Sequence, residues 1–363
     1  MEGQPEPEVL PTLLDGAVGL DTTDVSELYP LRAIASDRAR PLSERLAAYE
    51  DLIASEVGDT SFGRARNLER DAGVRQLFLK FEGNNPTGTQ KDRIAFAQVH
   101  DSLRRGFDAV TIATCGNYGA AMAFAASLAG VRCVIHIPET YTTRRLDEMV
   151  AAGAEIVRVP GDYEAAVEAS KRQAAKEELY DANPGGANTA LQMHAYGEVA
   201  REIFDELGDA PAIVAVSVSN GTTLAGLYRG FASLWRRGKT SRVPRFVAGS
   251  SHGKNPIVRS YLRNLPSCED LDPSRVRETS VNEPLINWHS YDGDAALDAI
   301  RRSRGWAADA SDRDMLRMAK RLRDSEGLSV LPASTAGLVV LLEHHAAEPL
   351  PPDRYVALLT GRR

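Results

Sequence analysis

The sequence is poor in cysteine and in metal-binding histidine patterns. Its 363 residues contain three cysteines, Cys115, Cys133 and Cys268, which form no CxxC pair and no disulfide framework. This usage fits a reducing compartment, so we expect the protein in the cytoplasm. The seven histidines offer no HExxH motif, and the adjacent His344 and His345 cannot easily share an ion on one helix, so no metal site is expected.

Basic clusters and long apolar runs are also missing. Lysine and arginine total 43 against 50 aspartate and glutamate residues, which gives a net charge of −7. Nucleic acid and anionic membranes are therefore not expected as partners. The longest apolar run, residues 119–131, is too short to span a bilayer. The first basic residue is Arg32, so no secretory signal is expected.

Strand-like and helix-like segments alternate from Gln76 onwards, which predicts an α/β fold with parallel strands and helices on both faces. A break near Asp181 separates two such lobes. Residues 1–30 are predicted to form a loose acidic arm, and residues 42–57 an amphipathic helix capped by Ser43. The predicted strands are residues 76–82, 109–115, 132–138, 155–161, 212–221, 245–251 and 355–363.

The segment GNNPTGTQKDR, residues 83–93, follows the first of these strands. Its glycines and lysine suggest a phosphate-binding P-loop, but Thr89 and Gln90 separate Gly88 from Lys91, whereas a P-loop lysine follows its second glycine directly. The lysine is thereby turned by more than half a helical turn, so we reject a P-loop. Two readings of Lys91 remain: a solvated lysine in the first turn of a helix, or a lysine in semi-apolar surroundings that releases its proton.

Three further polar loops, residues 114–119, 217–226 and 359–363, follow predicted strands. In open α/β sheets, ligands bind beyond the carboxyl ends of the strands. The loop at 217–226, SVSNGTTLAG, has small and hydroxyl residues and no lysine where a strand meets a helix. These are features of a neutral phosphate site. They are equally features of a helix cap built from small residues for close packing.

Together these loops resemble the pyridoxal-phosphate enzymes of fold type II, in the tryptophan synthase β superfamily, and most closely the threonine synthases. The family pattern around the Schiff-base lysine, Asn-Pro-Thr-Gly-Ser-Phe-Lys-Asp-Arg, is matched by NPTGTQKDR at residues 85–93. The family's Ser-Gly-Asn-x-Gly is matched by CGNYG at residues 115–119, and its Leu-Thr-Gly by residues 359–361. The resemblance covers residues 58–361.

The resemblance implies a two-lobe fold with parallel and mixed sheets wrapped by helices. Residues 58–84 and 182–363 would form a larger lobe that holds the cofactor phosphate. Residues 85–181 would form a smaller, mobile lobe that carries the Asn-Gly loop, and residues 1–57 an N-terminal arm and helix. Family members are commonly dimers, so a homodimer with a complete site in each subunit is expected.

The resemblance also implies a role for each loop. Lys91 would hold pyridoxal 5′-phosphate and move protons, which requires a lowered pKa. Asn117 would hydrogen-bond the ring O3′, and the Thr360 hydroxyl would face the ring nitrogen without forcing its protonation. The cofactor phosphate would be held by Ser219, Asn220, Gly221, Thr222 and Thr223. The carboxylate of an amino-acid substrate would be held by Thr87, Thr89, Thr114, Gly116 and Tyr118.

Three departures from the family pattern concern the substrate. Gln90 replaces phenylalanine, Cys115 replaces serine or threonine, and Tyr118 is bulkier than the usual histidine or threonine. All three lie near the expected substrate carboxylate, so they put the substrate in question and leave the cofactor unaffected. No histidine is near Cys115 in sequence, so it is interpreted as a packed thiol and not as a nucleophile.

The implied activity is elimination or replacement at the β- or γ-carbon of an amino acid with an activated oxygen leaving group. O-phosphohomoserine and O-phosphoserine are the first substrates to test. A serine or threonine dehydratase and a non-catalytic module that binds the cofactor or an amino acid are the alternatives, whereas a missing GxGxxG argues against NAD. Cations available for a substrate phosphate are Arg93, Arg144, Arg145, Lys254 and Arg259. Polar groups that would line the pocket instead are Asn282, Asn287, His289 and Tyr291.

Overall fold

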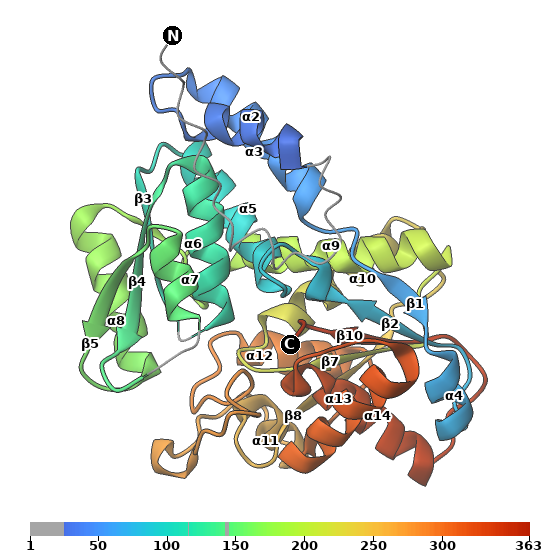
Figure 1. The fold of residues 1–363 in the computed structure, drawn as a ribbon. Coiled ribbons are helices and arrows are strands. Elements are labelled where there is room, and N and C mark those ends of the chain that lie inside the picture. The colour runs from blue at the N-terminus through green and yellow to red at the C-terminus, as the bar shows by residue number, and fades with distance from the viewer. Residues whose placement is uncertain (1–24, 115, 142–144) are drawn as a thin grey trace.

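The computed structural model describes residues 25–114, 116–141 and 145–363, and its strands form two sheets (Figure 1). The larger sheet has the order β1-β2-β10-β7-β8-β9, in which β1 is antiparallel to β2 and all other neighbours are parallel. Its strands are β1 (Phe62–Arg64), β2 (Leu77–Phe81), β7 (Ile213–Ser217), β8 (Arg245–Ser251), β9 (Trp306–Ala310) and β10 (Tyr355–Leu359). The expected α/β class with parallel and mixed sheets is confirmed.

The smaller sheet is entirely parallel, in the order β5-β4-β3-β6. It consists of β3 (Ala109–Ala113), β4 (Arg132–Pro138), β5 (Glu155–Val159) and β6 (Tyr180–Asp181). Every residue of the central strands β3 and β7 is buried, as expected for parallel strands covered on both faces. The exact lobe boundaries at residues 57, 84 and 181 stay a prediction.

Helices cover both sheets (Figure 1). In the smaller sheet, α6 (Asn117–Ala129) and α8 (Tyr163–Glu177) pack on β3 and β4, with α5 (Lys91–Arg104) and α7 (Leu146–Ala151) against α6. The larger sheet carries α14 (Ala336–Ala347) across β7, β8 and β9. The remaining helices are α2 (Val25–Ser36), α3 (Leu42–Glu56), α4 (Arg66–Ala72), α9 (Thr189–Leu207), α10 (Thr222–Arg236), α11 (Pro256–Leu262), α12 (Gly293–Arg302) and α13 (Asp312–Glu326). None of these helices is long and apolar enough to cross a membrane.

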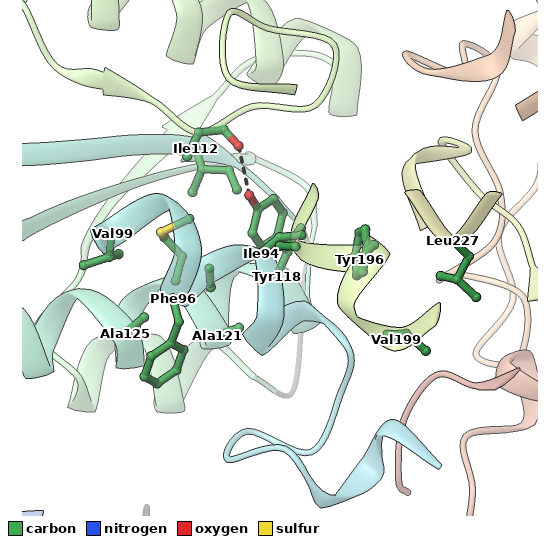
Figure 2. Packing of buried hydrophobic residues seen from close by; sticks show 14 of the residues in the cluster. Ile94, Phe96, Val99, Ile112, Tyr118, Ala121, Ala125, Tyr196, Val199 and Leu227 are labelled. Carbon is green, nitrogen blue, oxygen red and sulfur yellow. Dashed lines mark hydrogen bonds between the residues drawn. The ribbon is translucent and has the colours of Figure 1, made fainter. Parts of the chain in front are cut away.

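Helix α9 connects the two halves of the hydrophobic core. It packs on α5 on one side and on α10 on the other. Figure 2 shows apolar side chains of α5, α6 and α9 in this core, among them Phe96, Tyr118 and Tyr196. This core fixes the first turns of α5 and α6, which carry two of the predicted site residues.

Two predictions for the N-terminal region are wrong in detail. Helix α3 begins at Leu42 after Pro41, so Ser43 lies inside the helix and no side chain caps it. Residues 25–36 form α2, although they were expected to belong in part to a loose arm. The rest of that arm, residues 1–24, lies outside the described residues, as do Cys115 and Arg144.

Candidate active site

The polar loops that follow parallel strands meet at one cavity of about 630 Å³. Its wall includes residues 89–91 after β2, residues 114 and 116–118 after β3, residues 217–224 after β7, and Thr360 after β10. The volume lies within the range of about 300–1,000 Å³ that is typical of small-molecule sites. The structure therefore brings together loops that are about 270 residues apart in the chain at the place where open α/β sheets bind ligands.

Lys91 is the first residue of α5, and its side chain faces the cavity. Its Nζ lies 5.3 Å from the ring centroid of Tyr118 and 5.9 Å from that of Tyr196. Burial lowers the pKa of Lys91 to about 8, against an opposing effect of the Asp292 carboxylate. A lysine with this pKa is partly neutral near neutral pH, and a neutral amine is both a nucleophile and a base. These surroundings agree with the semi-apolar environment expected from the sequence and favour it over a fully solvated lysine.

The carboxylate of Asp92, the residue after Lys91, holds the loop that precedes Lys91. Asp92 is fully buried and accepts hydrogen bonds from the Thr87 backbone N–H at 3.0 Å and from the Thr87 hydroxyl at 2.8 Å. Burial raises the pKa of Asp92 to about 7, against the opposing effect of these hydrogen bonds. Thr87 is not part of the cavity wall, so the structure does not support its predicted contact with the substrate carboxylate. Its hydroxyl is used to fix the loop instead.

The C-terminal segment holds the same loop from the other side. The Gln90 N–H donates to the Thr360 carbonyl at 2.9 Å, and the Arg362 N–H donates to the Gly88 carbonyl at 2.9 Å. Gly88 has a φ of +86°, and a Cβ there would lie 2.7 Å from Nε of Arg362. The Arg362 guanidinium also donates to the carbonyls of Gly83 and Pro86 at 3.2 and 3.3 Å. These contacts hold Thr360 in the cavity wall.

Asn117 begins α6, and its amide is oriented by Arg145. The Arg145 guanidinium donates to Oδ1 of Asn117 at 2.8 Å and to the Thr87 carbonyl at 2.9 Å. Because Oδ1 is occupied by this donor, the Nδ2 group of Asn117 is the part of the amide left to donate to a ligand. From the sequence, Arg145 was predicted only as a cation for a substrate phosphate. Its contact with Asn117 could not be predicted, because the two residues are far apart in the chain.

The other predicted substrate contacts, Thr89, Thr114, Gly116 and Tyr118, all line the cavity. The Tyr118 hydroxyl is directed inward, where it donates to the Ala182 carbonyl at 3.1 Å and meets the Gln98 amide. The cavity therefore receives the face of the Tyr118 ring and not its hydroxyl.

Residues 219–221 lie between β7 and α10, residues 222 and 223 begin α10, and all five are in the cavity wall. Within the described chain, no acceptor meets the backbone N–H groups of residues 219–224. These donors and the positive end of the helix macrodipole form a site for an anion. Gly221 has a φ of +95°, and a Cβ there would lie 2.8 Å from the Asp292 carbonyl oxygen. Only glycine permits this turn without strain.

Side chains in this segment mostly support the loop. The Thr222 hydroxyl donates to the Asp292 carboxylate at 2.5 Å, and the Asn287 amide donates to Oδ1 of Asn220 at 3.1 Å. Asp292 is buried, and burial raises its pKa against opposing hydrogen bonds from Thr222 and Thr189. The sequence did not identify Asp292 as part of the site, because its DG dipeptide is typical of any turn before a helix.

The cations predicted for a substrate phosphate lie elsewhere. Arg93 is buried in ion pairs with Glu82 at 2.5 Å and Glu202 at 2.6 Å. Arg145, Lys254 and Arg259 are not in the cavity wall. Of the four predicted polar residues, Asn287 lines the cavity, whereas Asn282, His289 and Tyr291 do not. Among the residues that the structure describes, no group of three or more His, Cys, Asp or Glu side chains could hold a metal ion.

Comparison with known proteins identifies the family. Residues 53–361 match the family described as pyridoxal-phosphate dependent enzymes. The chain belongs to this family. The pyridoxal-phosphate dependent enzymes similar to it include a threonine synthase of Methanocaldococcus jannaschii, 29% identical over 84% of this chain and 74% of the relative. A threonine synthase of Mycobacterium bovis is 30% identical over 82% of this chain and 81% of the relative.

The fold is similar to that of a solved threonine deaminase. The crystal structure of a T.th. threonine deaminase superposes with a TM-score of 0.71, at 21% identity over 88% of this chain and 97% of that one. The fold type II architecture implied by the sequence motifs is thereby confirmed. The cofactor of the family is pyridoxal phosphate.

The residues of the cavity fit this cofactor. Its phosphate suits the free N–H groups of residues 219–224, where a Cβ at Gly221 would fill part of the loop. Its aldehyde suits an amine of lowered pKa, which Lys91 supplies. Thr360 lies in the wall, and a hydroxyl residue is compatible with a neutral pyridine nitrogen.

Proposed function

We propose that the protein catalyses elimination or replacement at the β- or γ-carbon of an α-amino acid. The observation that carries the proposal is Lys91, a lysine of lowered pKa in the same cavity as an anion site without cations and an oriented asparagine amide. The similarity to threonine synthases supports an amino acid as the substrate. When bound, pyridoxal phosphate withdraws electrons from the α-carbon of such a substrate.

Different residues of this chain would bind the cofactor, transfer the proton and hold the substrate. The N–H groups of residues 219–224 would hold the cofactor phosphate, and the Asn117 amide would donate to the ring oxygen. The Lys91 amine, once free, would take the proton from the α-carbon and return a proton later in the reaction. Thr89, Thr114 and Gly116 would hold the substrate carboxylate.

Two hydrogen bonds connect residues of the cavity wall. The Tyr141 hydroxyl donates to Glu283 at 2.7 Å, and the Trp288 indole donates to Asp162 at 3.1 Å. Each joins a residue near the smaller sheet to the loop before α12. Exclusion of water from the reacting atoms would favour addition of a bound nucleophile over simple hydrolysis. A serine or threonine dehydratase is the alternative, in which elimination is not followed by replacement.

The assembly and location are part of the proposal. We expect a homodimer with a complete site in each subunit. Size-exclusion chromatography with light scattering tests this, since a stable active monomer would refute the dimer and leave the chemistry intact. The cysteine usage supports a cytoplasmic location.

The test of the function uses proton exchange and product analysis. Holoprotein is incubated in D₂O with serine, threonine, homoserine and their O-acetyl and O-phospho derivatives, and loss of the α-proton is followed by NMR. Exchange followed by release of the β- or γ-substituent is expected for at least one substrate. Lys91→Ala should abolish exchange, whereas Lys254→Ala, away from the cavity, should not. Holoprotein that exchanges no α-proton of any of these amino acids would contradict the proposal.

A further inference from the structure

Arg145 lies directly before α7 and outside the cavity wall, yet its guanidinium contacts both loops that carry the cofactor residues. Its Nη1 donates to Oδ1 of Asn117 at 2.8 Å, and its Nη2 donates to the Thr87 carbonyl at 2.9 Å. Asn117 begins α6, whereas Thr87 belongs to the loop at residues 83–90 that leads into Lys91. One side chain therefore joins the loop of the lysine to the loop of the asparagine.

A carboxylate holds the guanidinium in this position. Glu148, one turn along α7, accepts hydrogen bonds from Nε of Arg145 at 3.1 Å and from Nη2 at 2.6 Å. The side chain of Arg145 is 18% exposed, and that of Glu148 is 41% exposed. Because the guanidinium is a planar fork, this pair also fixes the direction of its other N–H groups. The contacts with the two loops therefore cost little additional side-chain entropy.

Arg145 determines which way the Asn117 amide points, because a guanidinium has donors and no acceptor. The oxygen of the amide must face it, since the flipped amide would place two N–H groups against a cation. Asn117 lines the cavity, so its Nδ2 group is the part of the amide that can donate to a ligand there. Without Arg145 the amide could rotate and turn its oxygen towards the ring oxygen of the cofactor, and an amide oxygen cannot donate.

The same contacts argue against the role that the sequence suggested for Arg145, which was to bind a substrate phosphate. An arginine that moved to such a phosphate would break its charge-assisted hydrogen bond to Asn117 and its bond to the Thr87 carbonyl. Phosphate binding by Arg145 would therefore disturb the cofactor site that the reaction needs.

We infer that Arg145 is a positioning residue for the proposed reaction, which acts through Asn117 and Thr87 and contacts neither cofactor nor substrate. Through Asn117 it fixes the hydrogen-bond donor for the ring oxygen of pyridoxal phosphate. Through Thr87 it holds the loop of Lys91 at a constant distance from that donor. The inference rests on the proposed function, because the contact between Asn117 and the ring oxygen is part of it.

A double-mutant cycle tests whether Arg145 acts through Asn117. Apoprotein is titrated with pyridoxal phosphate for the unaltered chain, Arg145→Met, Asn117→Ala and the double variant. We expect each single change to weaken cofactor affinity by about tenfold, as the loss of one hydrogen bond to a charged group does. The loss in the double variant should be at least about fivefold smaller than the product of the two single losses, because both changes remove the same contact.

The visible absorption band of the holoprotein gives a second readout, because it responds to hydrogen bonding at the ring oxygen. Arg145→Met and Asn117→Ala should shift this band in the same direction, and Arg145→Lys, which keeps a charged donor, should restore it at least in part. Arg132→Met is the matched control and should change neither affinity nor band. Arg132 also pairs with a glutamate, Glu155 at 2.7 Å, but it begins β4, at the opposite end of the strands from the cavity.

The inference is overturned if the two single losses multiply in the double variant, or if Arg145→Met leaves both affinity and band unchanged. Thermal unfolding establishes that the variants fold. If Arg145→Met does not, a crystal structure of the unaltered holoprotein decides. Asn117 within hydrogen-bond distance of both Arg145 and the ring oxygen supports the inference, whereas Arg145 bound to the cofactor, or apart from Asn117, overturns it.

These readouts depend on cofactor binding and not on turnover. A holoprotein that exchanges no α-proton would therefore refute the proposed function and leave the result of the double-mutant cycle unaffected.

Discussion

Replacement of Gly221 by valine tests whether the loop at residues 219–224 holds the cofactor phosphate. The φ of +95° is unfavourable for a residue with a Cβ and costs about 1–3 kcal/mol. The new Cβ would also lie 2.8 Å from the Asp292 carbonyl oxygen, 2.9 Å from Cβ of Ala296 and 3.0 Å from Cδ1 of Ile257. Crowding of this kind costs about 1–3 kcal/mol more. The loop can relieve both only by moving, which takes its N–H groups away from the phosphate.

Gly208→Val is the control, because Gly208 has a φ of +70° at the end of α9 but a Cβ added there would meet no atom within 4 Å among the described residues. Both variants should unfold at a lower temperature. Only Gly221→Val should lose cofactor affinity, by roughly 5- to 150-fold for 1–3 kcal/mol, when apoprotein is titrated with pyridoxal phosphate. Equal cofactor dissociation constants in Gly221→Val and Gly208→Val would show that the phosphate binds elsewhere.

Three further predictions test the supporting structure. The rate at which apoprotein captures pyridoxal phosphate should rise about tenfold per pH unit below pH 8 and level off above it. The reason is that the lowered pKa of Lys91 makes the neutral amine predominant above pH 8. A flat profile from pH 6 to 10 would refute Lys91 as the reacting amine. Arg93→Met leaves the buried Glu82 without its cation and should lower the free energy of unfolding in urea by about 3–5 kcal/mol, and a loss below 1 kcal/mol would show that the ion pairs are dispensable. Arg362→Ala removes two bonds to the loop at residues 83–90 and should weaken cofactor affinity by about tenfold, whereas unchanged affinity would mean that the loop holds its shape alone.

The strands and their order in sequence were largely predictable. The strands predicted at residues 132–138 and 245–251 are β4 and β8, with the same boundaries. They were predictable because parallel strands buried on both faces consist of nearly uninterrupted apolar residues. The short strands β1 and β9 were not predicted, since FGR is only three residues long and WAADA shows no alternation. Their strand geometry comes from pairing with neighbours and not from local preference.

Site residues that belong to a sequence motif were predictable. Contacts between residues that are distant in the sequence were not. Lys91, Asn117 and Thr360 are in the wall of one cavity because their loops all follow parallel strands. The contact of Arg145 with Asn117 depends on how helix α7 packs, which no local pattern encodes. The motifs therefore predict the family's cofactor and the residues that would hold it, and they leave the substrate pocket undefined.

Covalent mapping of the cofactor tests the central claim most directly. Holoprotein reduced with borohydride, digested and analysed by mass spectrometry should carry one pyridoxyl phosphate group, on Lys91. The chain offers two informative alternatives: Lys80, buried in an ion pair with Glu202 at 2.6 Å, and Lys254, outside the cavity wall. Label on Lys91, lost in Lys91→Ala, is the result that the account predicts. Label on Lys80 or Lys254, or full label retained in Lys91→Ala, would contradict it.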